Sequence, residues 1–514
     1  MKKQRYIQVI LVVVIFTIST SLFAQSKYEM RAAWIATVAN IDWPQRNTFD
    51  PSEQRAQMIS ILDSLAALNF NTVILQARPM TDAFYESELE GWSHFLTGQQ
   101  GVAPSPFYDP LAFVIHEAHK RQIEVHVWLN PYRVLNVDNI KLLSHNHIYY
   151  RQPQLFVKYG NQYYFNPGLD KTREYLVDVV SDIVRRYDID AVHFDDYFYP
   201  YPIANLDFPD QRTFDNYPRG FTDKSAWRRN NVDLIIQELS TAIKKIKPWV
   251  EFGISPFGVW RNIDKDPLGS KTTAGQTNYD DLYADVRLWL EKGWIDYVTP
   301  QLYWEIGKKA ADYKELVGWW SRNSFNSNLY IGVAPYKLTT SPEEAWKTPN
   351  EICRQLQLNK NYTTTKGAMF FSTTPLLENR LGLCDSLQYN YYKYPALVPA
   401  NKNIDGYESK SPKNLRIEKF GIRDYLMWDE VYDAGAYEIF YYVVYMFNKG
   451  ETINIDNSAK IVMKTDETCI DLSSIDSEFL EDVYFVVTSV NRFHKESKVT
   501  TILGYTFEKD IFLQ

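Results

Sequence analysis

Two adjacent carboxylates, Asp195 and Asp196, directly follow a mostly apolar run from Ile189 to Phe194. This run suits a strand that is covered on both faces, as in a parallel sheet. Two ionised carboxylates this close repel each other, so one of them should have a raised pKa. A protonated acid beside a charged one is what cleavage of a glycosidic bond requires. The alternative is structural, because an acid after a strand often caps the next helix or pairs with an arginine.

Polar side chains also stand at the ends of two earlier apolar runs, at Arg78 and Asn130. Arg133 follows in the same segment as Asn130 and could pair with Asp195 or with an anionic group of a substrate. Holding the loops in place explains Arg78 and Asn130 equally well. The functional interpretation is that they recognise hydroxyl or carboxylate groups of a substrate.

A third polar group, Gln301, Tyr303 and Glu305, lies at or just after the end of the run Ile295–Leu302. Tyr303 could donate a hydrogen bond to a developing charge. Glu305 is the best candidate for a separate second carboxylate that works with one of the aspartates, with Asp82 as a weaker candidate. A solvated acid in a loop is an equally good explanation of Glu305.

Aromatic side chains recur near the ends of several apolar runs. They are Trp34, Trp92, Trp128, Trp260, Trp304, Tyr197, Tyr199 and Tyr336. Taken singly, packing in the core explains each of them; taken together, they indicate a cleft whose rings stack on sugars. The residues predicted to bind substrate are Trp34, Arg78, Asn130, Arg133, His193, Tyr197, Trp260, Gln301, Trp304 and Tyr336. His193 is otherwise explained as a satisfied core histidine, and it could orient Asp195.

Eight runs of strand length alternate with helical patterns. The expected strands are Met30–Val38, Asn71–Gln76, Ile123–Leu129, Ile189–Phe194, Val250–Ser255, Ile295–Leu302, Leu329–Ala334 and Gly367–Ser372. The expected helices are Pro51–Asn69, Asp109–Arg121, Asp170–Tyr187, Asp223–Ile246, Tyr279–Lys292, Ala310–Ser321 and Asn350–Asn359. This alternation predicts an α/β fold, a TIM (β/α)8 barrel. An open doubly wound sheet is disfavoured because no glycine-rich phosphate loop follows the first strand.

The longest connections, residues 80–106, 134–167 and 197–221, are expected as loops at the carboxyl ends of the strands. In a TIM barrel this end carries the active site. The barrel is expected to span residues 27–387, with residues 388–408 as a linker. Residues 409–510 contain short alternating strands and resemble a fibronectin type III domain, a small all-β sandwich. No chemistry is assigned to this domain.

Residues 1–24 have the layout of a secretory signal peptide. A basic start precedes an apolar segment, Ile7–Ile18, and cleavage is expected after Ala24. No cysteine follows that would carry a lipid, so the chain is predicted to be exported to the periplasm or cell surface. The net charge of -8 argues against nucleic acid as a partner. No spacing of Cys and His indicates a zinc site, and no metal or cofactor is expected.

Six motifs are similar to those of the glycosyl hydrolase-like 10 family. They are EMRAAWIATV (29–38), IDWP (41–44), QARP (76–79), WLNPY (128–132), HFDDYFYP (193–200) and PQLYW (300–304). The resemblance covers about Lys27–Leu387 and implies a TIM-barrel glycosidase associated with bacterial cell envelopes. It implies a glycan substrate of the peptidoglycan type, in strands that have lost their stem peptides.

The aspartate pair also resembles the adjacent acids of retaining hexosaminidases, in which the 2-acetamido oxygen of the substrate is the nucleophile. This resemblance implies that Asp195 orients the acetamido group and Asp196 is the acid/base, with Tyr303 assisting; the two roles could be swapped. Ala334-Pro335-Tyr336 stands where many barrel glycosidases carry a nucleophilic Glu, which favours substrate assistance. The alternative function is a non-catalytic carbohydrate-binding protein of the cell envelope, which the aromatics and the C-terminal domain would serve equally well.

Overall fold

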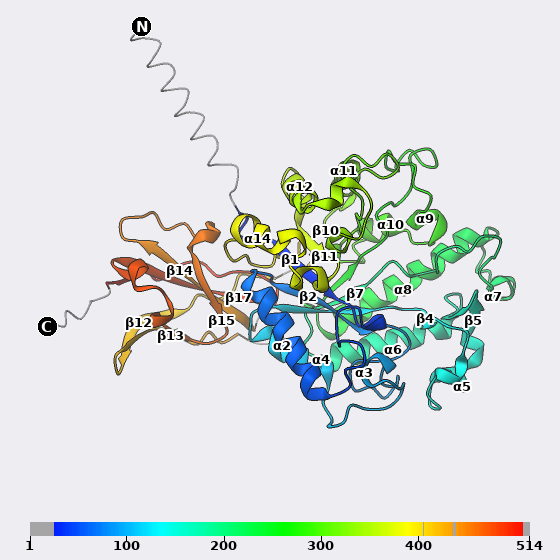
Figure 1. The fold of residues 1–514 in the computed structure, drawn as a ribbon, viewed down its shortest axis with the longest axis horizontal. Coiled ribbons are helices and arrows are strands. Elements are labelled where there is room, and N and C mark those ends of the chain that lie inside the picture. Colours follow the sequence, from blue (N-terminus) through cyan, green and yellow to red (C-terminus); the bar gives the residue numbers. More distant parts are fainter. Residues whose placement is uncertain (1–24, 405, 434, 436–437, 507–514) are drawn as a thin grey trace, which may run out of the picture.

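The computed structural model describes residues 25–404, 406–433, 435 and 438–506. Figure 1 shows two bodies, a large α/β part and a smaller all-β part that lies at the left of the view. The predicted signal peptide, residues 1–24, lies outside the described residues. Within the described part of the chain, no helix is both long and apolar enough to span a membrane.

The large part is a closed barrel of eight parallel strands. Its strands are β1 (Met30–Ile35), β2 (Thr72–Arg78), β3 (Glu124–Leu129), β7 (Ala191–Phe194), β8 (Glu251–Ile254), β9 (Tyr297–Val298), β10 (Asn328–Val333) and β11 (Thr365–Phe370). Each barrel strand pairs with the next barrel strand along the chain, and β11 pairs with β1 to close the barrel. The predicted TIM barrel is therefore confirmed, with all eight strands at the expected runs.

Helices surround the barrel. The longer ones are α2 (Pro51–Ala67), α4 (Pro110–His119), α6 (Asp170–Arg186), α8 (Lys224–Ile246), α11 (Tyr313–Asn323) and α12 (Asn350–Asn359). Shorter ones are α3 (His94–Thr97), α5 (Ile148–Arg151), α7 (Gln211–Asn216), α9 (Asn278–Asp281), α10 (Val286–Glu291), α13 (Thr373–Leu377) and α14 (Leu383–Ser386). Several starts are set by aspartate caps; the Asp223 side chain, for example, accepts from the backbone N–H groups of Ser225 and Ala226.

The predicted helix Tyr279–Lys292 is wrong in its middle. The structure has two short helices here, α9 and α10, because Tyr283 has a φ of 53°, which no right-handed helix accommodates. The Asp285 side chain then accepts from the N–H of Leu288 and starts α10.

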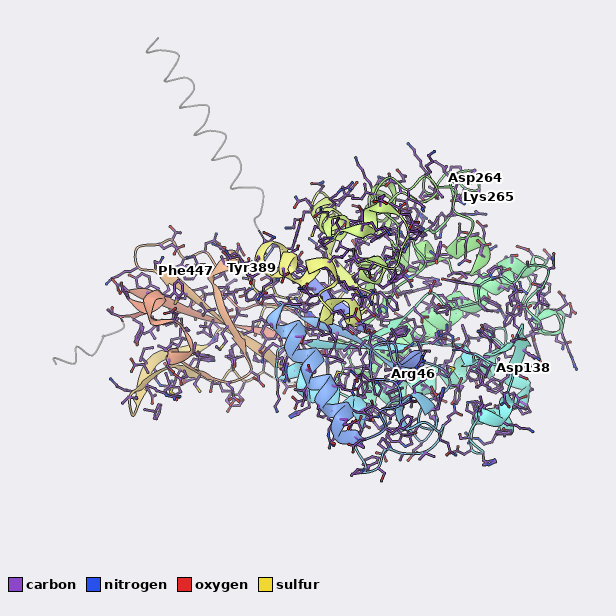
Figure 2. All side chains as sticks on the ribbon, viewed as in Figure 1. Arg46, Asp138, Asp264, Lys265, Tyr389 and Phe447 are labelled. Atoms are coloured by element: carbon purple, nitrogen blue, oxygen red, sulfur yellow. The ribbon has the colours of Figure 1, made fainter. Side chains whose placement is uncertain are left out.

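The connection after β3 was predicted to be an irregular loop. It carries an antiparallel sheet of its own. Strands β4 (Arg133–Leu135), β6 (Gln162–Phe165) and β5 (Phe156–Tyr159) pair in that order. The sheet lies at the right of Figure 1, at the end of the barrel away from the all-β part. Asp138 and Phe447, labelled in Figure 2, mark these two ends of the molecule.

The all-β part consists of two antiparallel sheets. One has the order β12 (Lys413–Phe420), β13 (Arg423–Asp429), β16 (Cys469–Asp471), and the other β15 (Ile461–Thr465), β14 (Ile439–Asn448), β17 (Val483–Asn491), β18 (Leu503–Tyr505). Apolar side chains from both sheets form one core, with Trp428 and Phe485 among its buried members. This arrangement is consistent with the predicted fibronectin type III-like sandwich.

The sandwich closes the base of the barrel, where the strands begin. The Glu496 carboxylate lies 2.5 Å from the ammonium of Lys27 and accepts from the Tyr28 hydroxyl at 2.7 Å. Asn401, in the connector, donates to the Glu251 carboxylate at the start of β8 at 3.0 Å. The opposite end of the barrel is thus the end that remains open for a site.

Candidate active site

The backbone of β7 directs the aspartate pair into the open end of the barrel. Side chains alternate along a strand, and Ala191 belongs to the core inside the barrel, whereas Val192 and Phe194 pack outward against the helices. Asp195 continues the inward series just past the strand end. Both Asp195 and Asp196 are buried, at 4% and 2% relative exposure.

Three donors surround the Asp195 carboxylate. The indole N–H of Trp128 donates at 3.0 Å, the Asn130 amide at 3.3 Å and the backbone N–H of Tyr197 at 3.1 Å. Burial raises the pKa of Asp195, but the charge of Arg133 and these hydrogen bonds act in the opposite direction. These groups therefore favour the ionised form of Asp195 and oppose the effect of burial.

Asp196 has a different environment. Its carboxyl group accepts from the Tyr201 hydroxyl and from the Gln301 amide. Burial and the neighbouring charge of Asp195 raise the pKa of Asp196 to about 7. Asp196 is therefore the member of the pair that holds a proton near neutral pH.

A cluster of rings lies beside the pair around Phe371, which follows β11 directly. Its ring centroid is 6.0 Å from those of Trp34 and Tyr336, 6.2 Å from that of Tyr303 and 6.5 Å from that of Trp128. The pKa of Tyr303 is raised well above its ordinary value. Burial is the main cause, and the nearby Tyr336 and Asp196 add to it. Tyr303 is thus a neutral hydroxyl that is available as a donor.

Arg133 and Tyr197 flank the pair on the side of the β4-β6-β5 sheet. The guanidinium of Arg133 lies over the Tyr197 ring, 4.3 Å from its centroid. The backbone N–H of Arg133 donates to the Asn130 side chain at 3.1 Å. The loop after β3 thus connects Arg133 to a residue that holds Asp195.

Arg78, at the end of β2, holds this loop in place. Its guanidinium is fully buried and forms two hydrogen bonds to the Glu90 carboxylate, at 2.7 and 2.6 Å. It also donates to the backbone carbonyls of Asn130 and Pro131. The loop-holding interpretation of Arg78 is therefore supported by its contacts, and its donors do not face a substrate.

His193 likewise has no free nitrogen. Its Nδ1 lies 2.9 Å from the Tyr297 hydroxyl and its Nε2 lies 2.9 Å from the Ser255 hydroxyl. Burial lowers the pKa of His193 well below its ordinary value. His193 is thus a satisfied core histidine of the barrel interior, and its two side-chain contacts do not include Asp195.

The contacts of three other predicted residues are made with side chains other than Asp195 and Asp196. Glu305 forms an ion pair with Lys308 at 3.2 Å in the loop after β9. The Trp304 ring packs edge-on against Phe257, with centroids 5.4 Å apart. Trp260 is buried between helices, where it stacks on Trp319 at 5.7 Å. The prediction that Trp260 lines the cleft is therefore not supported.

Two residues of the site, Tyr201 and Phe371, were not predicted from the sequence. Tyr201 continues the alternation of tyrosines at 197 and 199, which is a signal that the sequence does contain. Tyr199 instead points outward and its hydroxyl accepts from Asn231. Nothing local marks Phe371, because only closure of the barrel brings the end of β11 next to Trp34.

Comparison with known proteins identifies the family. A model of the glycosyl hydrolase-like 10 family matches residues 29–348. Glycosyl hydrolase YngK of Bacillus subtilis (strain 168) is 42% identical over 497 residues, which cover 95% of this chain and 96% of YngK. Glycosyl hydrolase DigH of Escherichia coli (strain K12) is 39% identical over 371 residues, which cover 68% of this chain and 83% of DigH.

Among solved structures, the catalytic domain of a β-amylase from Paenibacillus polymyxa aligns with 72% of this chain and 99% of its own length. The TM-score is 0.47 and the sequence identity 10%, too low to bear on function. The family model matches more than half of the chain, and YngK matches 95% of it. The chain therefore belongs to the glycosyl hydrolase-like 10 family and is a glycoside hydrolase.

Proposed function

We propose that the enzyme cleaves glycosidic bonds in an N-acetylhexosamine-containing glycan of the cell envelope, of the peptidoglycan type. The observation that carries this proposal is the contrast within the aspartate pair. One carboxylate has three donors and an arginine beside it, whereas its neighbour has a pKa raised to about 7. Hydrolysis of a glycosidic bond with general acid catalysis needs both states side by side.

In this mechanism Asp196 is the acid and base. Protonated Asp196 donates its proton to the oxygen of the departing sugar as the bond from that oxygen to the anomeric carbon breaks. The ionised group then removes a proton from the water that completes hydrolysis. A group with a pKa near the working pH is suited to both steps.

Asp195 is proposed to orient the 2-acetamido group of the substrate. As an anion it can accept from the acetamido N–H, which turns the acetamido oxygen toward the anomeric carbon. The oxygen then acts as the nucleophile. Two features favour such substrate assistance: Ala334-Pro335-Tyr336 stands after β10 in place of a nucleophilic Glu, and Glu305 is paired with Lys308.

The aromatic cluster around Phe371 is proposed as the wall against which the sugar rests. The rings of Phe371, Tyr303 and Tyr336 are half-buried, so they offer apolar faces and keep hydroxyl groups near the reacting atoms, whereas Trp34 and Trp128 are buried. The Tyr303 hydroxyl would assist Asp195 in holding the acetamido group. Tyr336 would contact the sugar face, and the buried Trp34 would support Phe371.

The location that suits this function is the periplasm or the cell surface. The support is the layout of residues 1–24, which is that of a signal peptide. The glycan is then both substrate and the reason for association with the envelope.

Activity of four proteins tests the proposal: the wild type, Asp195→Asn, Asp196→Asn and Glu305→Gln. The substrates are a chitooligosaccharide, a peptide-free peptidoglycan strand and a matched oligomer without acetamido groups. New reducing ends should form from the acetylated glycans alone, and both Asp variants should lose roughly 100-fold or more in kcat. Full activity of Asp196→Asn would contradict the assignment, and equal hydrolysis of the unacetylated oligomer would exclude substrate assistance.

A binding protein without turnover is the alternative that the same measurement separates. Such a protein would retain the glycan and release no reducing ends. The buried pair argues against it, because binding alone does not require two acids whose mutual repulsion is unfavourable.

A further inference from the structure

We propose that a lysine-lined groove at the base of the barrel binds a linear polymer that carries repeated phosphate groups. The groove lies where the barrel, the connector and the sandwich meet, at the opposite end of the barrel from Asp195 and Asp196. Binding there would hold the enzyme on an anionic polymer of its surroundings and would leave the active site open. This inference does not depend on the proposed function.

Two cavities of about 460 Å3 each form the groove. The first lies between the barrel base and the sandwich, and the second lies beside the end of α12. Tyr28 and Lys366 line both cavities, so the two are neighbours that one extended chain can occupy together. The lysines of the first cavity are Lys27, Lys366, Lys402, Lys495 and Lys498, and those of the second are Lys360 and Lys366.

The first cavity carries an excess of positive charge. Its described lining includes five lysines and three acids, of which Lys27 is paired with Glu496 at 2.5 Å and Lys498 with Glu408 at 3.1 Å. In the part of the chain that the structure describes, the other three lysines have no carboxylate within ion-pair distance; they are Lys366, Lys402 and Lys495. Asp456 is the remaining lining acid and balances one of them. This positive charge is local, because the whole chain has a net charge of -8.

The second cavity adds donors that the protein does not use. Asn359 is 6% exposed, and its side-chain oxygen accepts from the Tyr313 hydroxyl at 3.0 Å, but its side-chain nitrogen has no partner among the described residues. A buried donor without a partner is unfavourable until a ligand or water supplies an acceptor. The charge of Glu29 acts on the next residue, Lys360, but Glu29 is already paired with Arg31 at 2.9 Å. Both cavities therefore offer donors to a ligand that is rich in acceptors.

These donors suit phosphate better than carboxylate. Arginine matches a planar carboxylate with two parallel hydrogen bonds, whereas lysine binds phosphate as a point charge. No arginine is among the described residues that line either cavity. A chain of phosphates could place one group near Lys402 and Lys495 and further groups near Lys366 and Lys360. The lysines line cavities, which suit a polymer chain better than the flat surface of a membrane.

Binding of inorganic polyphosphate tests the inference. The protein is titrated with a long polyphosphate and with triphosphate, at low and high salt. The wild type should bind the long polymer, and more weakly as the salt concentration rises. The triple variant Lys366→Gln, Lys402→Gln, Lys495→Gln should lose roughly 10- to 100-fold in affinity. Lys360→Gln should weaken binding of the long polymer alone, because triphosphate is short enough to occupy the first cavity by itself.

A second triple variant is the matched control: Lys265→Gln, Lys292→Gln, Lys309→Gln. These lysines are exposed, line neither cavity and have no ion pair among the described residues. Figure 2 labels Lys265 on the far side of the molecule from Phe447 of the sandwich. The control removes the same charge and should keep the affinity near the wild-type value. Equal losses in the two triple variants would show that net charge alone matters and would overturn the groove.

Two further ligands distinguish phosphate from other anions. Polyglutamate with the same number of charges should bind roughly 10-fold more weakly than polyphosphate. Vesicles of phosphatidylglycerol should not displace the polymer. Equal affinity for polyglutamate, or binding to the vesicles and not to polyphosphate, would overturn the inference. Every readout here is binding, so the result stands whether or not the enzyme cleaves the proposed glycan.

Discussion

Asp195 and Asp196 are neighbours of the same residue type, yet their surroundings separate their pKa values. Trp128, Asn130 and the N–H of Tyr197 donate to Asp195, so its negative charge is well solvated by the protein. Asp196 is equally buried, and the charge of Asp195 beside it makes ionisation still less favourable. The pair thus shares its charge unequally, which is the property that the proposed chemistry uses.

The raised pKa of Asp196 should make the protein less stable at neutral and alkaline pH than at acidic pH. The pKa of Asp196 is about 7 in the folded protein, whereas the ordinary value for an aspartate is 3.8. Between these values the folded state holds the extra proton, so the free energy of unfolding falls as the pH rises. Above pH 7 the buried charge costs on the order of 4 kcal/mol relative to an unperturbed group.

Asp196→Asn should therefore stabilise the protein at pH 8 while it removes activity. The amide oxygen still accepts from Tyr201, and no charge is buried. The gain in melting temperature should be several degrees at pH 8 and small at pH 5, since wild-type Asp196 is protonated there. Thermal unfolding of both proteins at the two pH values measures this, and an equal gain at both would contradict the raised pKa.

At the scale of elements, the loop after β3 is the part that holds the site together. Asn130 contacts Asp195, Arg133 flanks the pair, and Arg78 fixes the carbonyls of Asn130 and Pro131 from β2. Glu90 completes this support from the connection after β2. The geometry of the pair thus depends on an ion pair whose two side chains are fully buried.

Arg78→Ala should destabilise the protein by about 3–5 kcal/mol, because it leaves the Glu90 carboxylate buried without its partner. It should also lower kcat, since the loop that carries Asn130 loses its support. Chemical denaturation and initial rates measure the two effects. Arg46→Ala is the control: Arg46, which is labelled in Figure 2, is exposed, and its removal should change stability by less than about 0.5 kcal/mol. Unaltered stability of Arg78→Ala would show that Glu90 finds other partners.

The barrel strands could be predicted because strands covered on both faces need continuous apolar runs, such as Val73–Leu75 in β2. The break at Tyr283 could not, because a positive φ at a tyrosine is imposed by packing and not by its own preference. The strands β4, β5 and β6 were missed because they are three or four residues long. Runs of that length carry little periodic signal.

Some residues of the site could likewise be predicted from the sequence, and others could not. Asp195, Asp196, Asn130 and Gln301 are close together, since each stands at the end of a predicted strand and parallel strands end at one edge. Residues in long connections could not be placed in this way. Tyr201 contributes to the site, whereas Trp260 turns back between helices, and both follow strands of the same barrel.

At the scale of the whole molecule, the sandwich completes the barrel base. Lys27 and Glu496 are almost fully buried, with side-chain exposures of 3% and 5%. The Glu496 carboxylate also accepts from Tyr445 and Thr488 of the sandwich, at 2.6 and 2.7 Å. An interface of this kind couples the folding of the two parts.

The described parts should therefore unfold in one cooperative transition. Glu496→Ala should lower its midpoint by an amount that corresponds to about 3–5 kcal/mol, because the ammonium of Lys27 is left buried and unpaired. Denaturant unfolding followed by tryptophan fluorescence measures this. Glu408→Ala removes an exposed ion pair with Lys498 and should change stability by about 0.5 kcal/mol or less. Two separate transitions in the wild type would show that the sandwich is only an appendage.

The leaving-group dependence of Asp196→Asn tests the central claim most directly. The measurement compares kcat/KM of this variant and the wild type on two aryl chitooligosaccharides, one with an activated phenol and one with a poor leaving group. If Asp196 is the acid, the variant loses about 100- to 10,000-fold on the poor leaving group and far less on the activated one, which departs without a proton. An equal loss on both substrates would contradict the role of Asp196, and the same selective loss in Asp195→Asn would assign the acid to Asp195.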